Sequence, residues 1–129
     1  MDEFDKWNDI KKKTSKNNKN RSFEEMDIFN VKIGKNIGFE QNGTGNQFIR
    51  PVLVIKKFSS SLFYAIPLST TKKRNRYYFE FEFIKDKKSV ALLSQMRNMD
   101  TKRLLNKIGK IKKDDFIELK KRLKKIIFD

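Results

Sequence analysis

Residues 78–83 read Tyr-Phe-Glu-Phe-Glu-Phe, so that phenylalanine and glutamate alternate along the chain. Successive side chains of a β-strand point to opposite faces, and the alternation therefore predicts a half-buried strand over Tyr77–Ile84. Four other short runs are rich in β-branched and aromatic residues and are bounded by polar or glycine-containing turns: Phe29–Ile33, Arg50–Phe58, Leu62–Leu68 and Val90–Met96. Five short strands at this spacing favour a small antiparallel barrel over a parallel sheet.

The segment before these strands differs from them in composition and in the spacing of its apolar residues. Phe4, Trp7 and Ile10 recur every three residues, which predicts a short amphipathic helix within Met1–Lys13. Thr14–Arg21 holds no apolar side chain and is typical of a linker. We therefore expect a helical extension and linker over residues 1–27, followed by a barrel domain over residues 28–129.

The segment after Asp100 is predicted to be helical. Leu104 and Leu105 suggest a short helix over Thr101–Lys107 with these two side chains turned inward. Over Asp114–Ile127, apolar residues recur at helical spacing between lysines and arginines, at Phe116, Leu119, Leu123 and Ile126. Asp114 and Asp115 stand where a helix N-cap is expected.

The charge balance points to an anionic partner. The 129 residues, enough for one domain, include 31 Lys+Arg against 16 Asp+Glu, a net charge of +15. Such a surplus favours RNA, DNA, an acidic protein or an anionic membrane as partner, although a lysine-rich composition alone also produces it. No apolar run approaches the roughly 20 residues that span a bilayer, and the acidic N-terminus does not resemble a signal peptide. We expect a cytoplasmic protein without a membrane segment.

The missing residue types narrow the chemistry. The chain has no cysteine and no histidine, which excludes disulfides, thiolate catalysis, Cys- or His-based metal sites and imidazole acid–base catalysis. Any catalysis has to use carboxylate, guanidinium, amine, phenol or hydroxyl groups. We expect no metal and no cofactor.

Three polar clusters lie in loops or at predicted strand ends: Gly38–Gln41, Arg50-Pro51 and Pro67–Thr70. If the second and third strands pair as a hairpin, Arg50 and Ser69 become neighbours and the Glu40 loop folds over them. This set fits RNA cleavage without a metal. Glu40 would act as base toward the 2′-hydroxyl, Arg50 would hold the phosphate and double as acid, and Ser69 or Thr70 would add a donor. Each cluster taken alone is equally typical of a turn, a strand start or a solvated loop.

The order of the motifs resembles the MazF/PemK family of toxins from toxin–antitoxin pairs. The resemblance covers residues 28–127 and lies in five segments: Gly38-Phe39-Glu40-Gln41-Asn42-Gly43, Arg50-Pro51-Val52-Leu53-Val54-Ile55, Pro67-Leu68-Ser69-Thr70, residues 90–100 and residues 103–109. It implies a small SH3-like barrel with a C-terminal α-helix, usually a homodimer. The implied activity is that of an mRNA interferase, a metal-independent endoribonuclease that cuts single-stranded RNA and is neutralised by a cognate antitoxin. The products would carry 2′,3′-cyclic phosphate and 5′-hydroxyl ends.

The resemblance also assigns roles to residues. The catalytic arginine, threonine and glutamate of the family correspond to Arg50, Ser69 and Glu40. Gln41 and Gln95 match positions near the RNA groove, and we take Thr70 and Arg97 as further RNA-binding candidates. The sequence departs from the family pattern in a longer loop at Thr44–Ile49, in serine for threonine at position 69, and in its N-terminal extension. A non-catalytic nucleic-acid- or partner-binding barrel on the same fold therefore remains the alternative, and a gyrase-directed relative is a weaker one.

Overall fold

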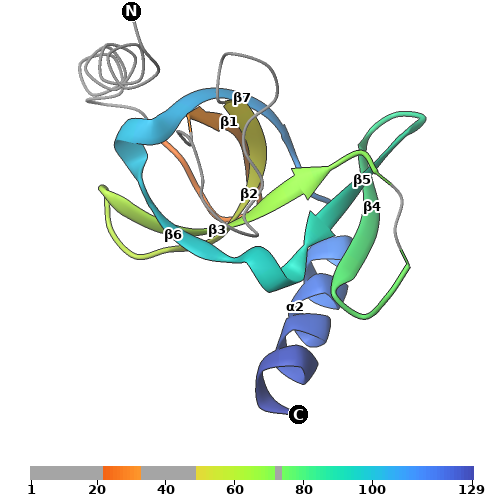
Figure 1. The fold of residues 1–129 in the computed structure, drawn as a ribbon. Coiled ribbons are helices and arrows are strands. Elements are labelled where there is room, and N and C mark those ends of the chain that lie inside the picture. The colour runs from red at the N-terminus through yellow and green to blue at the C-terminus, as the bar shows by residue number, and fades with distance from the viewer. Residues whose placement is uncertain (1–21, 33–48, 72–73) are drawn as a thin grey trace, which may run out of the picture.

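The computed structural model describes residues 22–32, 49–71 and 74–129, which form a curled antiparallel sheet followed by one helix (Figure 1). The strands are β1 (Asp27–Lys32), β2 (Ile49–Lys57), β3 (Leu62–Ser69), β4 (Tyr78–Ile84), β5 (Lys87–Leu92), β6 (Arg97–Asp100) and β7 (Leu104–Lys110). Two single 3-10 turns, η2 (Leu93–Gln95) and η3 (Thr101–Arg103), flank β6, and α2 (Lys113–Phe128) ends the fold. The expected mainly β fold with a C-terminal helix is confirmed. The expected N-terminal helix lies outside the described residues.

Strand β3 joins the two halves of the sheet. The strand order is β4-β5-β3-β2-β1-β7, and β6 adds to β3 beside this path. One edge of β3 pairs with β2. The other edge pairs with β6 over Leu62–Ala65 and with β5 at Leu68 and Ser69. Because β6 and β5 share one edge of β3, the sheet turns a corner at the C-terminal end of β3, where the β4–β5 hairpin leaves the barrel (Figure 1).

The central parts of β2 and β3 are buried on both faces, which explains their nearly continuous apolar sequences. One face forms an inner core inside the barrel: Phe23, Phe29, Val31, Val52, Val54, Phe63, Ala65, Met99 and Leu104. The other face forms a helix-side core with α2 and the β4–β5 hairpin: Ile28, Leu53, Ile66, Leu68, Phe79, Phe81, Ala91, Leu93, Ile111, Phe116, Leu119 and Leu123.

Strand β4 shows the alternation that its sequence predicts. Phe79 and Phe81 are buried while Glu80 is exposed. The rings of Phe79, Phe81 and Phe83 follow one another along the same face, with centroids 6.2 Å and then 6.0 Å apart. Phe83 is only partly buried and forms the outer end of this row.

The prediction of a helix over Thr101–Lys107 is wrong. Only Thr101–Arg103 form a 3-10 turn, in which the Asp100 side chain accepts a hydrogen bond from the Lys102 N–H at 2.9 Å. Leu104 instead begins β7, pairs with Val31 of β1 and is fully buried. Pairing with a distant strand thus overrides the weak helical preference of this short segment. The strand expected over Val90–Met96 is likewise wrong beyond Leu92, where β5 ends; η2 follows, and β6 begins only at Arg97.

Helix α2 agrees with its prediction except at its start. It runs from Lys113 to Phe128 and buries Phe116, Leu119 and Leu123. Its N-cap is Lys112, whose side chain makes no capping bond. The two aspartates, Asp114 and Asp115, lie in the first turn, where their charge complements the helix dipole.

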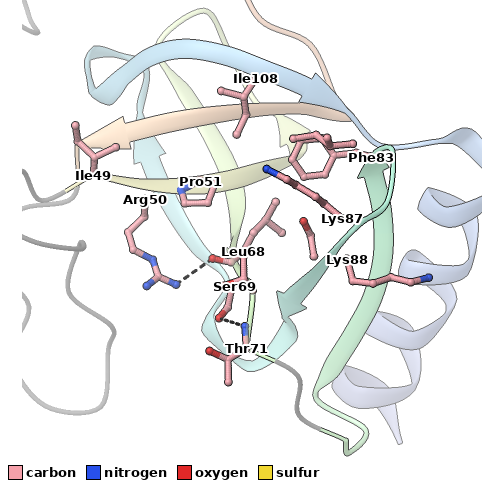
Figure 2. A pocket seen from close by; sticks show the side chains of 13 residues that line it. Ile49, Arg50, Pro51, Leu68, Ser69, Thr71, Phe83, Lys87, Lys88 and Ile108 are labelled. Atoms are coloured by element: carbon pink, nitrogen blue, oxygen red, sulfur yellow. Dashed lines mark hydrogen bonds between the residues drawn. The ribbon is translucent and has the colours of Figure 1, made fainter.

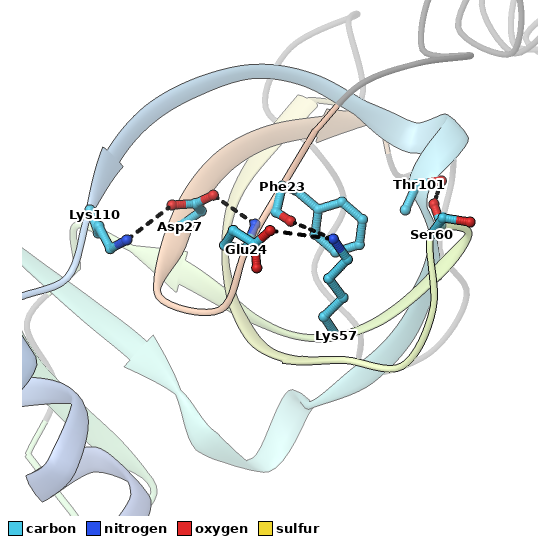
Figure 3. A network of polar contacts seen from close by, with 7 residues as sticks. All are labelled: Phe23, Glu24, Asp27, Lys57, Ser60, Thr101 and Lys110. Carbon is cyan, nitrogen blue, oxygen red and sulfur yellow. Dashed lines mark hydrogen bonds and ion pairs between the residues drawn. The ribbon is translucent and has the colours of Figure 1, made fainter.

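A buried carboxylate ties the start of the domain to β7. Asp27 is 3% exposed, and its Oδ2 accepts a hydrogen bond from the Glu24 N–H at 2.9 Å. Its Oδ1 has no hydrogen bond of good geometry, but its charge is balanced by ion pairs to the ammonium groups of Lys107 and Lys110, at 3.0 and 3.9 Å. Figure 3 shows the ion pair with Lys110. Lys57 of β2 donates to the Phe23 carbonyl at 3.0 Å. The segment before β1 is therefore held against the barrel from two sides.

Candidate active site

Arg50 and Ser69 lie next to each other at one end of the β2–β3 pair. Val52 of β2 stands opposite Pro67 of β3, and this antiparallel register, continued by two residues, places Arg50 opposite Ser69. Side chains opposite each other leave the same face of the sheet. The Arg50 guanidinium also donates through Nη2 to the carbonyl of Leu68, 3.0 Å away. The structure therefore brings the predicted arginine and hydroxyl together.

The Arg50 guanidinium is partly desolvated. Burial lowers the pKa of Arg50 from its ordinary value, but arginine titrates so far above neutrality that the guanidinium is charged before any reaction. Its Nε is buried and has no hydrogen-bond partner within the described part of the chain. A buried donor without an acceptor is costly. The charged guanidinium also lines an open groove, so it is suited to bind an anionic oxygen of a ligand.

Ser69 ends β3 with an oriented hydroxyl. Its Oγ accepts a hydrogen bond from the Thr71 N–H at 3.1 Å, as in a serine turn. The hydroxyl proton is left for donation. This bond restrains the side chain, which lacks the β-branch of the threonine that the family pattern has at this position. Thr70, the other hydroxyl considered, follows directly and is exposed.

A groove of about 580 Å³ opens beside this pair, and we call it the Arg50 groove. It is lined by Ile49, Arg50, Pro51, Leu68, Ser69, Thr70, Thr71, Phe83, Ile84, Lys87, Lys88, Ser89 and Ile108. Figure 2 shows a polar end with Arg50, Ser69 and Thr71, and an apolar end with Phe83 and Ile108. Pro51 and Leu68 lie between the two ends (Figure 2).

The other predicted site residues lie elsewhere. Glu40 and Gln41 fall outside the described residues. Gln95 ends η2 and Arg97 begins β6, and neither lines the Arg50 groove. Arg97 pairs with Ala65, which lies four residues before Ser69 on β3. At roughly 3.3 Å per residue, this separation is about 13 Å.

The β4–β5 hairpin supplies the groove residues that sequence reasoning missed, notably Phe83, Lys87 and Lys88. These residues approach Arg50 only because β5 pairs with the end of β3. The sole signal in the sequence was the alternation over residues 78–83, which places Phe83 on the same face as Phe79 and Phe81.

The apolar end depends on a glycine. A Cβ atom on Gly109 of β7 would lie 2.5 Å from Cδ2 of Phe83, closer than two carbon atoms can approach. Only glycine therefore lets the Phe83 ring lie directly over this backbone. This contact brings β4 against β7 and closes the groove beside Ile108.

Across residues 22–32, 49–71 and 74–129, no three Asp or Glu side chains gather closely enough to hold a metal ion. No helix among these residues is long and apolar enough to cross a membrane.

The fold and the groove together define a class of protein: a small basic antiparallel barrel that presents an arginine and a hydroxyl at one end of a groove. The chain belongs to the family described as the PemK-like, MazF-like toxin of type II toxin–antitoxin systems, whose model matches residues 24–127. No match to the sequence was found among curated proteins.

Several solved structures share the fold. MazF from Deinococcus radiodurans (Form-I) aligns with a TM-score of 0.67 at 17% identity, covering 84% of this chain and 98% of that one. The Mycobacterium tuberculosis toxin MazF-mt6 aligns with a TM-score of 0.60 at 13% identity, covering 78% and 95%. An endoribonuclease in complex with its cognate antitoxin from Mycobacterial species aligns with a TM-score of 0.62 at 9% identity, covering 82% and 95%.

Proposed function

We propose that this toxin is a metal-independent endoribonuclease that cuts single-stranded RNA. The observation that carries the proposal is the charged Arg50 guanidinium, which is partly buried and lies beside Ser69 in an open groove. A guanidinium and a hydroxyl at one point suit a phosphate group. The net charge of +15 suits a polyanion. Membership of the toxin family and the fold of solved endoribonucleases support the same conclusion.

In the proposed reaction, Glu40 takes the proton of a 2′-hydroxyl, and the resulting oxygen attacks the adjacent phosphorus. Arg50 and the Ser69 hydroxyl donate to the non-bridging oxygens, whose negative charge grows in the pentavalent transition state. The bond from phosphorus to the 5′-oxygen then breaks, and this oxygen leaves with a proton from Arg50, which recovers it from solvent. The products carry a 2′,3′-cyclic phosphate and a 5′-hydroxyl. Gln41, Thr70, Gln95 and Arg97 contact the flanking RNA.

The proposal extends to partners and place of action. The toxin acts on mRNA in the cytoplasm as a homodimer, and a cognate antitoxin neutralises it. The solved complex of a mycobacterial endoribonuclease with its cognate antitoxin supports the antitoxin as a partner. An acidic antitoxin segment would complement the surplus of 31 Lys+Arg over 16 Asp+Glu.

Cleavage in the presence of EDTA tests the mechanism. We expect the purified protein to cut a defined single-stranded RNA at selected positions in excess EDTA, and to leave cyclic phosphate ends that resist a 3′-phosphatase until acid opens them. Activity that appears only when a divalent metal is added would contradict the proposed chemistry. A protein that binds this RNA in a salt-dependent manner without cutting it would be the non-catalytic barrel of the same fold.

The Glu40→Gln variant tests the general base. Glutamine keeps the shape of the side chain but cannot accept the proton, so we expect single-turnover cleavage to slow by about 10²-fold or more. RNA affinity should stay within a few-fold of wild type. The neighbouring Gln41→Ala variant is the matched control and should weaken binding more than it slows the chemical step. Undiminished cleavage by Glu40→Gln would remove Glu40 from the mechanism.

A further inference from the structure

We infer that the apolar end of the Arg50 groove is a nucleobase subsite, in which Phe83 stacks on a base next to the cleaved bond and Lys87 binds the phosphate beside it. This inference rests on the proposed function, because it assumes that RNA occupies the polar end of the same groove. It assigns a substrate-binding role to side chains of the β4–β5 hairpin, whose pairing with β3 otherwise serves only to hold Ser69 in place.

Phe83 is an aromatic surface held in a fixed place. One side of its ring lies against the backbone of Gly109, where a Cβ atom would come within 2.5 Å. The Phe81 ring lies behind it, with centroids 6.0 Å apart and planes inclined by 33°. The remaining surface faces the groove with Ile84 and Ile108. A ring fixed by its neighbours loses little entropy when a base stacks on it, and stacking on aromatic side chains is a general mode of single-strand binding.

Lys87 is a cation that lines the groove beside this apolar end. Figure 2 shows its side chain pointing across the groove, beside the Phe83 ring and toward Pro51. The next residue, Lys88, points away from the groove and makes an ion pair with Glu82 at 3.7 Å (Figure 2). The two lysines are therefore not equivalent, and only Lys87 is directed at a ligand in the groove.

The arrangement of cations and apolar walls favours RNA over a protein side chain. The groove carries a cation at each end, Arg50 and Lys87, with apolar surface between and beside them. Single-stranded RNA presents groups in the same order, since each sugar between two phosphates carries a base with flat apolar faces. Among the described residues that line the groove, none is acidic, so none of these side chains repels the phosphates.

The test measures binding with a substrate that cannot react. The probe is the RNA cut in the EDTA experiment, with a 2′-deoxy nucleotide at the cleaved position, and each of the three nucleotides on either side is replaced in turn by an abasic residue. We expect one abasic position to weaken wild-type binding roughly 5- to 100-fold. In Phe83→Leu, which keeps the apolar packing on Gly109 but removes the aromatic face, this penalty should disappear. Comparison of the two changes forms a double-mutant cycle.

Lys87→Ala should behave differently from Phe83→Leu. It should weaken binding of every probe alike and reduce the slope of log affinity against log salt by about 0.7, the value for one phosphate contact on a single strand. The matched controls are Phe58→Ala and Lys56→Ala, an exposed aromatic and an exposed cation at the far end of β2, and both should bind as wild type does.

Two results would overturn the inference. One is a Phe83→Leu variant, folded by its thermal transition, that shows the wild-type penalty at every abasic position. The other is a Phe83→Leu variant that loses the same affinity for every probe, abasic or not. This result would make Phe83 a structural residue and leave the apolar end to a protein partner. Either result would leave the proposed function intact if the wild type cuts RNA in EDTA. Absence of cleavage by the wild type would instead refute the proposed function itself.

Discussion

Replacing Arg50 with alanine is expected to slow RNA cleavage by about 10³-fold, the order of effect seen when a group that stabilises transition-state charge is removed. Arg50 is the only arginine among the described residues that line the groove, so no neighbouring guanidinium can take its place. The measurement is single-turnover cleavage at saturating protein, which separates the chemical step from binding. RNA affinity should fall much less than the rate, because other cations still bind the backbone.

Two variants accompany Arg50→Ala. Arg50→Lys keeps the charge but loses the planar fork of donors, and we expect it to recover only a small part of the lost rate. Lys124→Ala removes one charge from an exposed position on α2, away from the groove, and should cleave as wild type does. Arg50→Ala protein that is folded and cuts RNA at more than a tenth of the wild-type rate would exclude Arg50 from the reaction. Thermal denaturation of each variant checks the fold.

Leu119→Ala is expected to lower the free energy of unfolding by about 3 kcal/mol, within the range for truncating a buried leucine. Leu119 is fully buried in the helix-side core, where α2 packs against the sheet. Its truncation leaves a cavity among rigid strands that cannot close around it. Urea denaturation followed by circular dichroism measures the change, with the midpoint expected to shift and the slope to stay constant.

The same helix provides the control for Leu119. Ile117 lies two residues earlier and is 41% exposed, so Ile117→Ala should change the free energy of unfolding by less than about 1 kcal/mol. Equal effects at the two positions would contradict the packing of α2 through its Leu119 face. RNA cleavage at low temperature should survive in both variants, because neither side chain lines the Arg50 groove.

Local patterns were sufficient to predict most of the strands, because strand alternation and β-branched runs are properties of neighbouring residues. The alternation over residues 78–83 predicted β4 and its buried face, and the spacing of Phe116, Leu119 and Leu123 predicted α2. The pattern failed at residues 104–107, where the deciding interaction is the pairing of β7 with β1, some seventy residues away. The spacing of apolar residues within a segment does not indicate which distant strand that segment pairs with.

The candidate site also has one part that the sequence predicts and another that it does not. The pairing of Arg50 with Ser69 was predictable, because a hairpin between consecutive strands fixes which residues meet. The contributions of Phe83 and Lys87 were not, because they depend on how a separate hairpin folds across the end of β3. The roles of Glu40 and Gln41 remain predictions from the family resemblance, and Gln95 and Arg97 lie apart from the groove.

The position of Ser69 on β3 has a consequence for control of the toxin. Ser69 ends β3, which is flanked by β2 on one side and by β6 and β5 on the other and is therefore an interior strand of the sheet rather than an edge. Opening such a strand costs nearly the whole free energy of unfolding, whereas edges and loops open at much lower cost. The arginine–serine pair is thus assembled in every folded molecule. An inhibitor that acts by distorting the arginine–serine pair would have to unfold the protein. An inhibitor that occludes the groove only has to bind there before RNA does.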